Sequence, residues 1–410
     1  MKKYIAMKKN IAATGILCVL LLLLLFSCNE DSSKGILQRV YSSTATESSY
    51  NQRYLGMDKA NGYVYLVRDN DVYRAASVYD SKDGNYDLKY TKLFELSTTS
   101  NNFLTIGYNN GNIYFATMES GTVRFFYASV DNITDAVTLK DVYESYSTIS
   151  FGNSLTVTAL SVARLSTDEI QFLFTAGGTS YYASTTPSHL TTNGISFSSD
   201  PVEVPENAEI VGSKSLRVRT EDPELDYDDN LNELYLIEDN NLKKVYVHLS
   251  DPDYFACGTD TISGTKYAAF MNGYIYKLEE SDRSGYAYER GDKAASFSEY
   301  ERNNNLLVTY DDGNNIVGYF YDTGVYLRVD YGSPVVRSIT DDANVFPLCI
   351  LGHRTNSSGY TEYLMLTQNN GFFVIEPYYH LKTSRSYITK VNNSSSSYNI
   401  ADYLSGDEDE

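Results

Sequence analysis

The stretch Asn112-Ile-Tyr-Phe-Ala-Thr-Met-Glu-Ser-Gly-Thr-Val-Arg-Phe-Phe-Tyr127 decides the fold. Aromatic and β-branched residues fill both halves, as is typical of strands. A short polar segment, Glu119 to Gly121, separates the halves, and its glycine tolerates the positive φ that tight hairpin turns require. The stretch therefore predicts a β-hairpin whose strands cover 112–117 and 122–127.

The same two-strand unit recurs along the chain, each time with Gly, Asn or Asp at the turn. The further hairpins are 62–68 with 71–75, 170–174 with 180–182, 233–237 with 242–247, 267–270 with 274–276, 306–310 with 316–320, and 363–366 with 372–375. Weaker strands are expected at 103–108 and 155–162. A two-strand unit that recurs roughly every 49 residues is typical of radial repetition. We therefore predict an all-β fold, a seven-bladed β-propeller over residues 51–385.

Two other β architectures remain open at this point. A pair of β-sandwiches also contains short alternating strands, and a parallel β-helix is a third arrangement, although it needs shorter and more regular coils. A helical repeat is disfavoured, because no apolar period of 3.6 residues persists beyond the N-terminal segment.

Composition limits the possible partners. Among 410 residues there are 53 acidic and 33 basic side chains, which gives a formal net charge of −20 at pH 7. Nucleic-acid binding requires a clustered positive surface, so no nucleic-acid partner is expected. Hydrophobic residues make up 42% of the chain, enough for a sizeable core, which excludes disorder along its whole length.

The N-terminus predicts export. Residues 1–27 combine a lysine-rich start with an apolar stretch that includes Leu20 to Leu25, and such a segment fits a signal peptide better than an uncleaved anchor helix. A polar segment, 28–50, is expected to act as a flexible tether. At the other end, residues 386–410 are predicted to form a polar tail that closes on Gly406-Asp-Glu-Asp-Glu410.

The segment Leu25-Phe26-Ser27-Cys28 resembles the lipobox of bacterial lipoproteins, in the relaxed form familiar from spirochaetes. The resemblance implies that Cys28 becomes the lipidated N-terminus of the mature protein. The lipid would then be the membrane contact and would hold the protein at the bacterial cell envelope, because two or three acyl chains give a lasting anchor. Whether the anchored protein faces the periplasm or the cell surface stays open. The hairpins resemble those of propeller lipoproteins and of quinoprotein or lactonase-like propellers, in architecture only.

The other cysteines and the histidines give little support for chemistry. Cys18 would leave with the signal peptide, and Cys257 and Cys349 could form a disulfide in an oxidising envelope or remain buried thiols. The four histidines are isolated from one another and from acidic clusters at metal-ligand spacing, so no cofactor is expected. They are His189, His248, His353 and His380.

Two acidic loops are weak candidates for a calcium site. Asp80, Asp83 and Asp87 surround a glycine, and Asp226 and Asp228 begin a segment that resembles the start of a calcium-binding loop. The second segment lacks the glycine and the final glutamate of that motif. Solvated loops between strands explain both sequences equally well, so no metal site is assigned.

Two classes of function fit these observations. The first is a non-catalytic propeller that binds or scaffolds a protein or glycan through loops between its blades. Tyr86 and Tyr286 are its candidate contacts, since tyrosine combines a rigid ring with a polar tip. The alternative is a lactonase- or glycosidase-like hydrolase with carboxylates or a metal ion at the central channel. The expected inner strands carry Tyr, Leu, Phe and Thr, which favours binding, and no catalytic residue is assigned.

Overall fold

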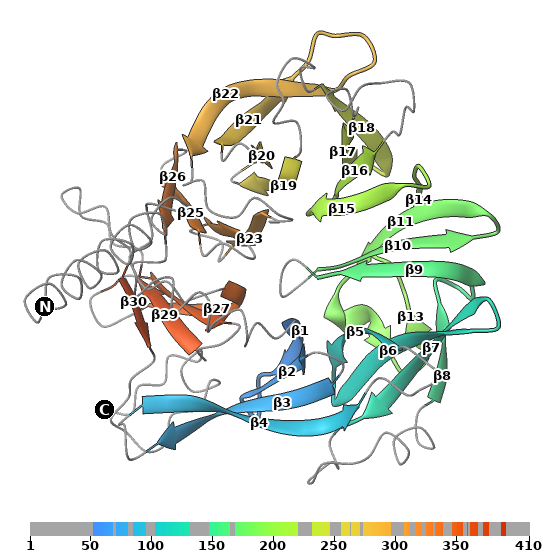
Figure 1. The fold of residues 1–410 in the computed structure, drawn as a ribbon, viewed down its shortest axis with the longest axis vertical. Helices are drawn as coiled ribbons and strands as arrows, with labels where there is room; N and C mark the ends of the chain where they lie inside the picture. The colour runs from blue at the N-terminus through green and yellow to red at the C-terminus, as the bar shows by residue number, and fades with distance from the viewer. Residues whose placement is uncertain are drawn as a thin grey trace, which may run out of the picture. The chain divides into compact units, whose positions relative to one another are not determined.

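The computed structural model shown in Figure 1 describes residues 52–390 except for eighteen gaps. The gaps are 69–70, 81–84, 96–102, 131–146, 165–168, 220–231, 247–255, 263, 271–273, 297–306, 312–315, 321–324, 331–332, 339–346, 356–358, 360, 368–371 and 377–386. All described residues belong to the compact unit Tyr50–Glu410. The predicted signal peptide, Cys28, the tether and the acidic segment 406–410 lie outside the described residues.

The predicted all-β class is confirmed. The described residues hold thirty strands and one short 3-10 turn, η1 (Pro187–His189). No helix among them is both long enough and apolar enough to cross a membrane.

The first two sheets cover the N-terminal half of this unit. One has four strands, β1 (Gln52–Asp58), β2 (Tyr63–Arg68), β3 (Asp71–Asp80) and β4 (Asn85–Glu95). The other has ten, β5 (Phe103–Asn109), β6 (Asn112–Glu119), β7 (Thr122–Ser129), β8 (Ser147–Phe151), β9 (Val157–Ala163), β10 (Ile170–Ala176), β11 (Thr179–Thr185), β12 (Leu190–Thr191), β13 (Gly194–Ile195) and β14 (Val202–Glu203).

The remaining strands form a closed barrel and two four-stranded sheets. The barrel holds β15 (Ala208–Gly212), β16 (Ser215–Arg219), β17 (Asn232–Glu238), β18 (Asn241–Tyr246), β19 (Ala256–Ile262), β20 (Thr265–Phe270), β21 (Tyr274–Glu280) and β22 (Tyr288–Ser296). The sheets are β23 (Leu307–Asp311), β24 (Ile316–Phe320), β25 (Val325–Asp330) and β26 (Ser333–Ser338), and β27 (Pro347–Thr355), β28 (Thr361–Thr367), β29 (Phe372–Glu376) and β30 (Tyr387–Lys390). The last strand, β30, lies beyond the expected end of the propeller at residue 385.

All seven predicted hairpins are confirmed as antiparallel pairs. They are β2–β3, β6–β7, β10–β11, β17–β18, β20–β21, β23–β24 and β28–β29. Turns within the described residues have the expected positive φ. Gly177 and Gly178 have φ of 60° and 84°, and Asp239 and Asn240 have φ of 49° and 58°. These are the backbone conformations that Gly, Asn and Asp adopt most readily.

The strand pairing follows the order of a β-propeller. Consecutive runs of four antiparallel strands succeed one another along the chain, beginning with β1–β4 and ending with β27–β30. Some neighbouring runs are also bridged. Val123 in β7 pairs with Val157 in β9, and β18 pairs in parallel with β22 to help close the barrel. Because these bridges merge neighbouring runs, seven separate blades stay a prediction.

A feature that the sequence analysis missed recurs in the first strand of five runs. Each of these strands contains a β-bulge in which an apolar residue precedes a glycine. The five pairs are Leu55-Gly56, Ile106-Gly107, Val211-Gly212, Cys257-Gly258 and Leu351-Gly352. A bulge leaves one residue outside the ladder and increases the local twist. The repeat therefore bends the first strands of five runs in the same way.

The bulge glycines allow the following run to approach closely. A Cβ on Gly56 in β1 would lie 2.9 Å from the Cβ of Tyr108 in β5. A Cβ on Gly107 in β5 would lie 3.1 Å from Cδ1 of Ile170 in β10. Real Cβ atoms do not come this close to backbone or Cβ atoms without displacement, so glycine is required at position 56 by packing as well as by its φ of 155°.

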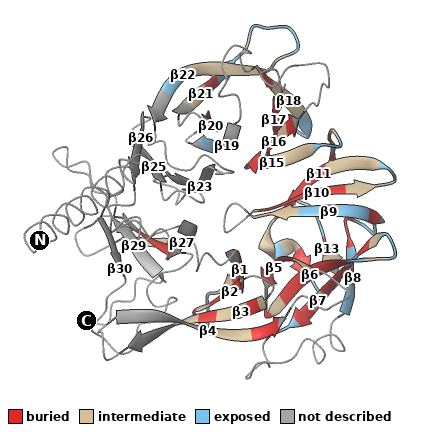
Figure 2. Ribbon diagram, viewed as in Figure 1, coloured by how far each residue is buried: buried red, intermediate tan, exposed pale blue. Residues whose placement is uncertain are grey.

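Apolar clusters join the sheets to one another, and Figure 2 shows buried residues concentrated in β1, β2, β6, β7 and β10. One cluster combines residues of β1, β2, β3 and β4 with residues of β5, β6 and β7. Another combines Tyr54, Val64 and Leu66 with Leu351 and Leu364. The first and last sheets of the chain therefore share a core. Burial of each large apolar side chain contributes about 1.5–3 kcal/mol.

Candidate functional site

The loop between β21 and β22 is the best-defined exposed feature of the barrel. It covers residues 281–287 and is called the 281–287 loop below. The amide of Ser281 donates a hydrogen bond to the carbonyl of Ala287 over 3.1 Å. The amide of Tyr286 donates a hydrogen bond to the carbonyl of Arg283 over 3.1 Å. Residues 282–285 are exposed, and Gly285 has a φ of 87° at the tip. Its own backbone thus folds the loop into a tight, projecting turn.

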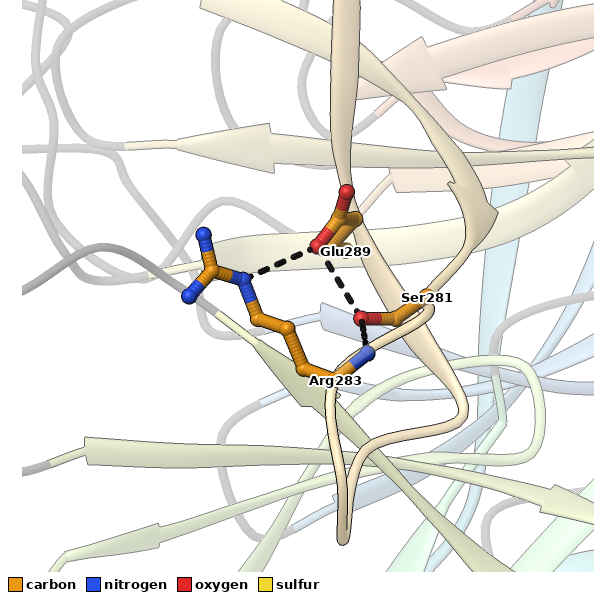
Figure 3. Close-up of polar contacts among 3 residues, drawn as sticks. All are labelled: Ser281, Arg283 and Glu289. Atoms are coloured by element: carbon orange, nitrogen blue, oxygen red, sulfur yellow. Dashed lines mark hydrogen bonds and ion pairs between the residues drawn. The ribbon is translucent and has the colours of Figure 1, made fainter.

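Glu289 in β22 supports the loop through polar contacts with two loop residues, Ser281 and Arg283, as Figure 3 shows. Glu289 Oε2 accepts hydrogen bonds from Ser281 Oγ at 3.0 Å and from Arg283 Nε at 3.2 Å. Ser281 Oγ in turn accepts a hydrogen bond from the amide of Arg283 at 3.1 Å. The Arg283 and Glu289 side chains are 55% and 37% exposed, so their ion pair contributes little to stability. Its effect is to fix the position of the Arg283 guanidinium.

Aromatic contacts support the same loop from β18. The Arg283 guanidinium carbon lies 4.1 Å from the centre of the Tyr246 ring. Tyr286 meets Tyr246 edge to face, with 5.1 Å between ring centres and 79° between ring planes. The amide of Ala287 donates to the carbonyl of Lys244 over 2.8 Å. Val245 and Tyr246 lie in register with Tyr288 and Glu289 in the parallel β18–β22 pair, and this register brings the two supports together.

A polar triad lies next to these contacts on β17 and β18. The Lys244 ammonium and the Tyr235 hydroxyl both donate to Glu233, and Lys244 Nζ also lies 5.4 Å from the centre of the Tyr286 ring. Burial raises the pKa of Glu233, but the two hydrogen bonds and the positive charge of Lys244 outweigh it, so the pKa lies below its usual value. Burial and the hydrogen bond to Glu233 raise the pKa of Tyr235. Glu233 is therefore ionised and Tyr235 is neutral at pH 7.

A second triad joins β17 to two further strands of the barrel, β20 and β22. Lys266 Nζ in β20 lies 3.0 Å from Glu238 Oε1 in β17, and the Tyr288 hydroxyl in β22 donates to Glu238 Oε2 over 2.5 Å. Burial alone would raise the pKa of Glu238. The hydrogen bonds from Tyr288 and Lys266 and the charge of Lys266 lower it by more, so the pKa lies below its usual value. This triad stabilises the barrel wall that carries the loop.

The first strands of three runs meet around two arginines. Arg164, directly after β9, donates to the carbonyl of Leu55, and its guanidinium carbon lies 4.8 Å from the centre of the Tyr54 ring. Arg53 in β1 donates to the Thr105 hydroxyl in β5. Because Leu55 lies in the bulge of β1, Arg164 supplies a partner to a carbonyl displaced from the ladder. Sequence analysis missed both arginines, since no local motif marks them.

Of the two tyrosines that were predicted to lie in loops, one lies in a loop and one lies in a strand. Tyr286 lies in the 281–287 loop, as predicted. The prediction for Tyr86 is wrong, because this residue belongs to β4 and pairs with Tyr79 of β3. The β3 and β4 ladder continues closer to its turn than the local Asp and Gly content suggested.

Two of the five weak calcium candidates lie in described strands. Asp80 ends β3 opposite Asn85, and Asp87 lies in β4 opposite Val78, so both are strand residues rather than loop residues. Asp83, Asp226 and Asp228 lie outside the described residues. Within the described ranges there is no group of three His, Cys, Asp or Glu side chains placed to hold a metal ion.

The histidines and Cys349 have structural surroundings where they are described. His189 lies in η1, and its Nδ1 is buried without a hydrogen-bond partner among the described residues. His353 lies in β27 with its ring 6.3 Å from that of Tyr363. Cys349 is a free, buried thiol, so the disulfide alternative is not realised, and burial raises its pKa. His248 and His380 lie outside the described residues, and the side chain of Cys257 is not described.

No protein-family model matches the chain, and no curated protein matches it significantly. Solved structures do match its fold. The Dos1 propeller is 9% identical with a TM-score of 0.39, over 79% of this chain and 77% of that one. A catalytically inactive virginiamycin B lyase from Staphylococcus aureus, solved with quinupristin, is 9% identical with a TM-score of 0.38, over 80% of this chain and 96% of that one. A yeast Nup82–Nup159–Nup116 nucleoporin chain is 7% identical with a TM-score of 0.36, over 79% of this chain and 97% of that one. With TM-scores below 0.5, these likenesses say nothing about function.

Proposed function

We propose that the chain is a lipid-anchored protein of the bacterial cell envelope whose β-propeller body binds or scaffolds a protein or glycan partner without catalysing a reaction. The observation that carries the binding role is the exposed 281–287 loop with its two supports. Glu289 fixes it from β22, and Tyr246 fixes it from β18. A loop that is already ordered loses little conformational entropy on binding, which favours affinity.

The side chains at the loop are suited to recognition. Arg283 and Tyr286 belong to residue types that are enriched at the energetic centres of interfaces, because they combine large contact area with hydrogen-bonding groups. Both are held in place by contacts with Tyr246. A partner would therefore meet a prearranged surface rather than two freely rotating side chains.

The binding role is tested by replacing residues 282–285 with a Gly-Ser repeat in the full chain. Immobilised protein is exposed to solubilised envelope material and to a glycan array, and the retained molecules are identified. We expect the wild type to retain a defined protein or glycan and the loop variant to lose most of it. A matched variant changes the exposed residues 192–193 between β12 and β13 and should behave as wild type. Equal retention by all three, or cleavage of the retained molecule, would contradict the proposal.

The anchor is proposed from the resemblance of Leu25-Phe26-Ser27-Cys28 to a lipobox. A thioether-linked diacylglycerol on Cys28, with a further acyl chain on the new N-terminus, would give lasting membrane attachment, since each buried CH₂ contributes about 0.8 kcal/mol. The acidic chain would gain nothing from anionic headgroups, so the lipid would supply the membrane contact.

Metabolic labelling with a fatty-acid analogue tests this anchor. Wild-type chain and Cys18→Ala should be labelled, and Cys28→Ala should not be. Cys18 is the matched control, because it lies in the predicted signal peptide and would be lost from the mature protein. Equal labelling of the Cys28→Ala chain would show that the lipid, if any, is attached elsewhere.

A further inference from the structure

The guanidinium of Arg283 uses its Nε atom within the loop and leaves the edge formed by Nη1 and Nη2, called the open edge below, without a hydrogen bond to the described residues. Its Nε donates to Glu289 Oε2 at 3.2 Å, and its face lies 4.1 Å from the centre of the Tyr246 ring. Nη1 and Nη2 have no hydrogen-bond partner among the described residues, and Figure 3 shows both pointing away from Glu289. The side chain is 55% exposed, so this open edge faces solvent.

We infer that the open edge of Arg283 binds a single carboxylate of a partner protein, through parallel hydrogen bonds from Nη1 and Nη2. Two parallel N–H donors match the two oxygens of a carboxylate, and this bidentate geometry is the strongest form of such a pair. The inference rests on the proposed binding function and adds the chemistry of the contact. Stacking on Tyr246 and the Nε contact to Glu289 hold the fork in position before the partner arrives.

The surrounding charges limit the ligand to one carboxylate. Glu279, Glu280 and Asp282 are exposed and lie on or beside the same loop. They would repel a run of acidic residues, because like charges at short distance raise the free energy of the complex. A lone Asp or Glu side chain, or a chain-terminal carboxylate, meets the Arg283 fork without bringing further charge.

The aromatic rings favour a protein over a glycan. Sugars stack on free aromatic faces, but one face of Tyr246 is covered by Arg283, and Tyr246 also meets Tyr286 edge to face. Lys244 Nζ lies 5.4 Å from the centre of the Tyr286 ring. The site therefore offers guanidinium hydrogen-bond donors beside rings that already carry cation and ring contacts, a combination that suits a peptide carboxylate better than a stacked sugar.

Protection from phenylglyoxal, which modifies exposed guanidinium groups, tests the inference on the unmodified full chain. The probe is a blocked Ala-Glu-Ala tripeptide at about 10 mM, because a single exposed ion pair gives only weak affinity. Modification of individual arginines is followed by mass spectrometry. We expect the peptide to slow modification of Arg283 about fivefold, since a bound carboxylate occupies both Nη atoms.

Two internal comparisons make the result specific. Arg124 is an exposed arginine of β7 without a stacked ring or ion pair among the described residues, and its modification should not change. A blocked Ala-Gln-Ala peptide should protect neither residue. Absence of protection at Arg283, or equal protection at Arg124, would overturn the inference. Stronger protection by an oligogalacturonate would also overturn it in favour of a glycan, while the binding function of the loop would stand or fall with the separate loop-replacement experiment.

Discussion

Glu289 connects the loop to the strand that follows it. Its Oε2 atom accepts hydrogen bonds from Ser281 and Arg283, which stand on either side of the exposed Asp282. The groups are largely solvated, so the contacts order the loop more than they stabilise the protein. Residues of this kind govern local opening, which has its own free energy separate from global unfolding.

We predict that Glu289→Ala loosens the loop without unfolding the barrel. Amide hydrogens of residues 282–286 should exchange about tenfold faster, because local opening is no longer opposed by two hydrogen bonds. The free energy of global unfolding should change by less than about 0.5 kcal/mol. Hydrogen exchange read by mass spectrometry checks this, with Glu280→Ala as the control, since Glu280 is exposed and its side chain makes no hydrogen bond or ion pair with the described residues. Unchanged exchange in Glu289→Ala would show that backbone contacts alone order the loop.

Glu238 makes stability depend on pH. Its pKa lies below the usual value of 4.5, so its contribution is complete above pH 4.5 and is lost as the pH falls through the folded-state pKa. Lys266 has a raised pKa, so its contribution is complete below pH 10.5 and is lost at higher pH. The pair therefore stabilises the barrel across the neutral range.

The variant Glu238→Gln should be less stable than wild type at pH 7 by about 0.5–1 kcal/mol, because the ion pair with Lys266 is lost. The difference should shrink as the pH falls below 4.5 and should be lost once it has passed through the lower folded-state pKa of Glu238. Urea unfolding at a series of pH values measures it. Glu203→Gln, at an exposed position of β14, is the control for the change of charge alone. A difference that is constant with pH would contradict the assignment.

At the scale of strands, the hairpins were predictable, and so were two first strands, 103–108 as β5 and 155–162 as β9, but the bulges within the first strands were not. Hairpin strands combine alternating apolar residues with adjacent turn residues, a signal contained within a short window. The bulged strands break that alternation. An extra residue such as Leu55 moves the side chains of the residues that follow it to the opposite face of the sheet. The repeated apolar-Gly pair was the available signal, and it becomes recognisable once the five strands are aligned.

At the candidate site, the loop position of one residue, Tyr286, was predictable from the sequence. Tyr286 follows Gly285 between two strand patterns, so its loop position could be inferred locally. Its partners Tyr246 and Arg283 are separated by 37 positions in sequence and meet only because β18 pairs with β22. A parallel bridge between two runs leaves no periodic trace in either segment, so the sequence carried no indication of this contact.

The bulge glycines supply a prediction at this scale. Gly56→Ala should destabilise the protein by about 2–3 kcal/mol, since the new Cβ meets Tyr108 and the backbone must also hold a positive φ. Gly177→Ala is the matched control, with a φ of 60° but no atom within 4 Å of the new Cβ. It should cost only about 1 kcal/mol. Urea unfolding compares the two, and equal losses would show that close approach of β5 does not determine the glycine at position 56.

Across the whole unit, an apolar cluster joins the beginning of the described chain to its end. Val64 and Leu66 of β2 lie in the same buried cluster as Leu364 and Leu366 of β28. Sheets that share a buried core unfold together, because separating them exposes apolar surface on both sides. The contacts among β1–β4 and β27–β30 therefore make the two ends of the fold interdependent.

We predict that Leu364→Ala destabilises the protein by about 2–4 kcal/mol, as expected for a large apolar side chain removed from a packed core. The residue is 2% exposed. Leu155→Ala, at a side chain that is 39% exposed, should cost less than about 1 kcal/mol. Equilibrium unfolding should lose β1–β4 and β27–β30 in one transition. Two separate transitions would show that the shared cluster does not couple the sheets.

We propose that the 281–287 loop is the surface through which the protein meets its partner. A photo-crosslinking amino acid placed at Ser284, at the exposed loop tip, tests it most directly in the cells that produce the protein. The same residue placed at Asn193, in an exposed turn of the ten-stranded sheet, is the control. We expect a discrete crosslinked product from position 284 and none from position 193, and we expect the first product to be lost in Arg283→Gln. The same products from both positions, or a product at 284 that is unaffected by Arg283→Gln, would contradict it.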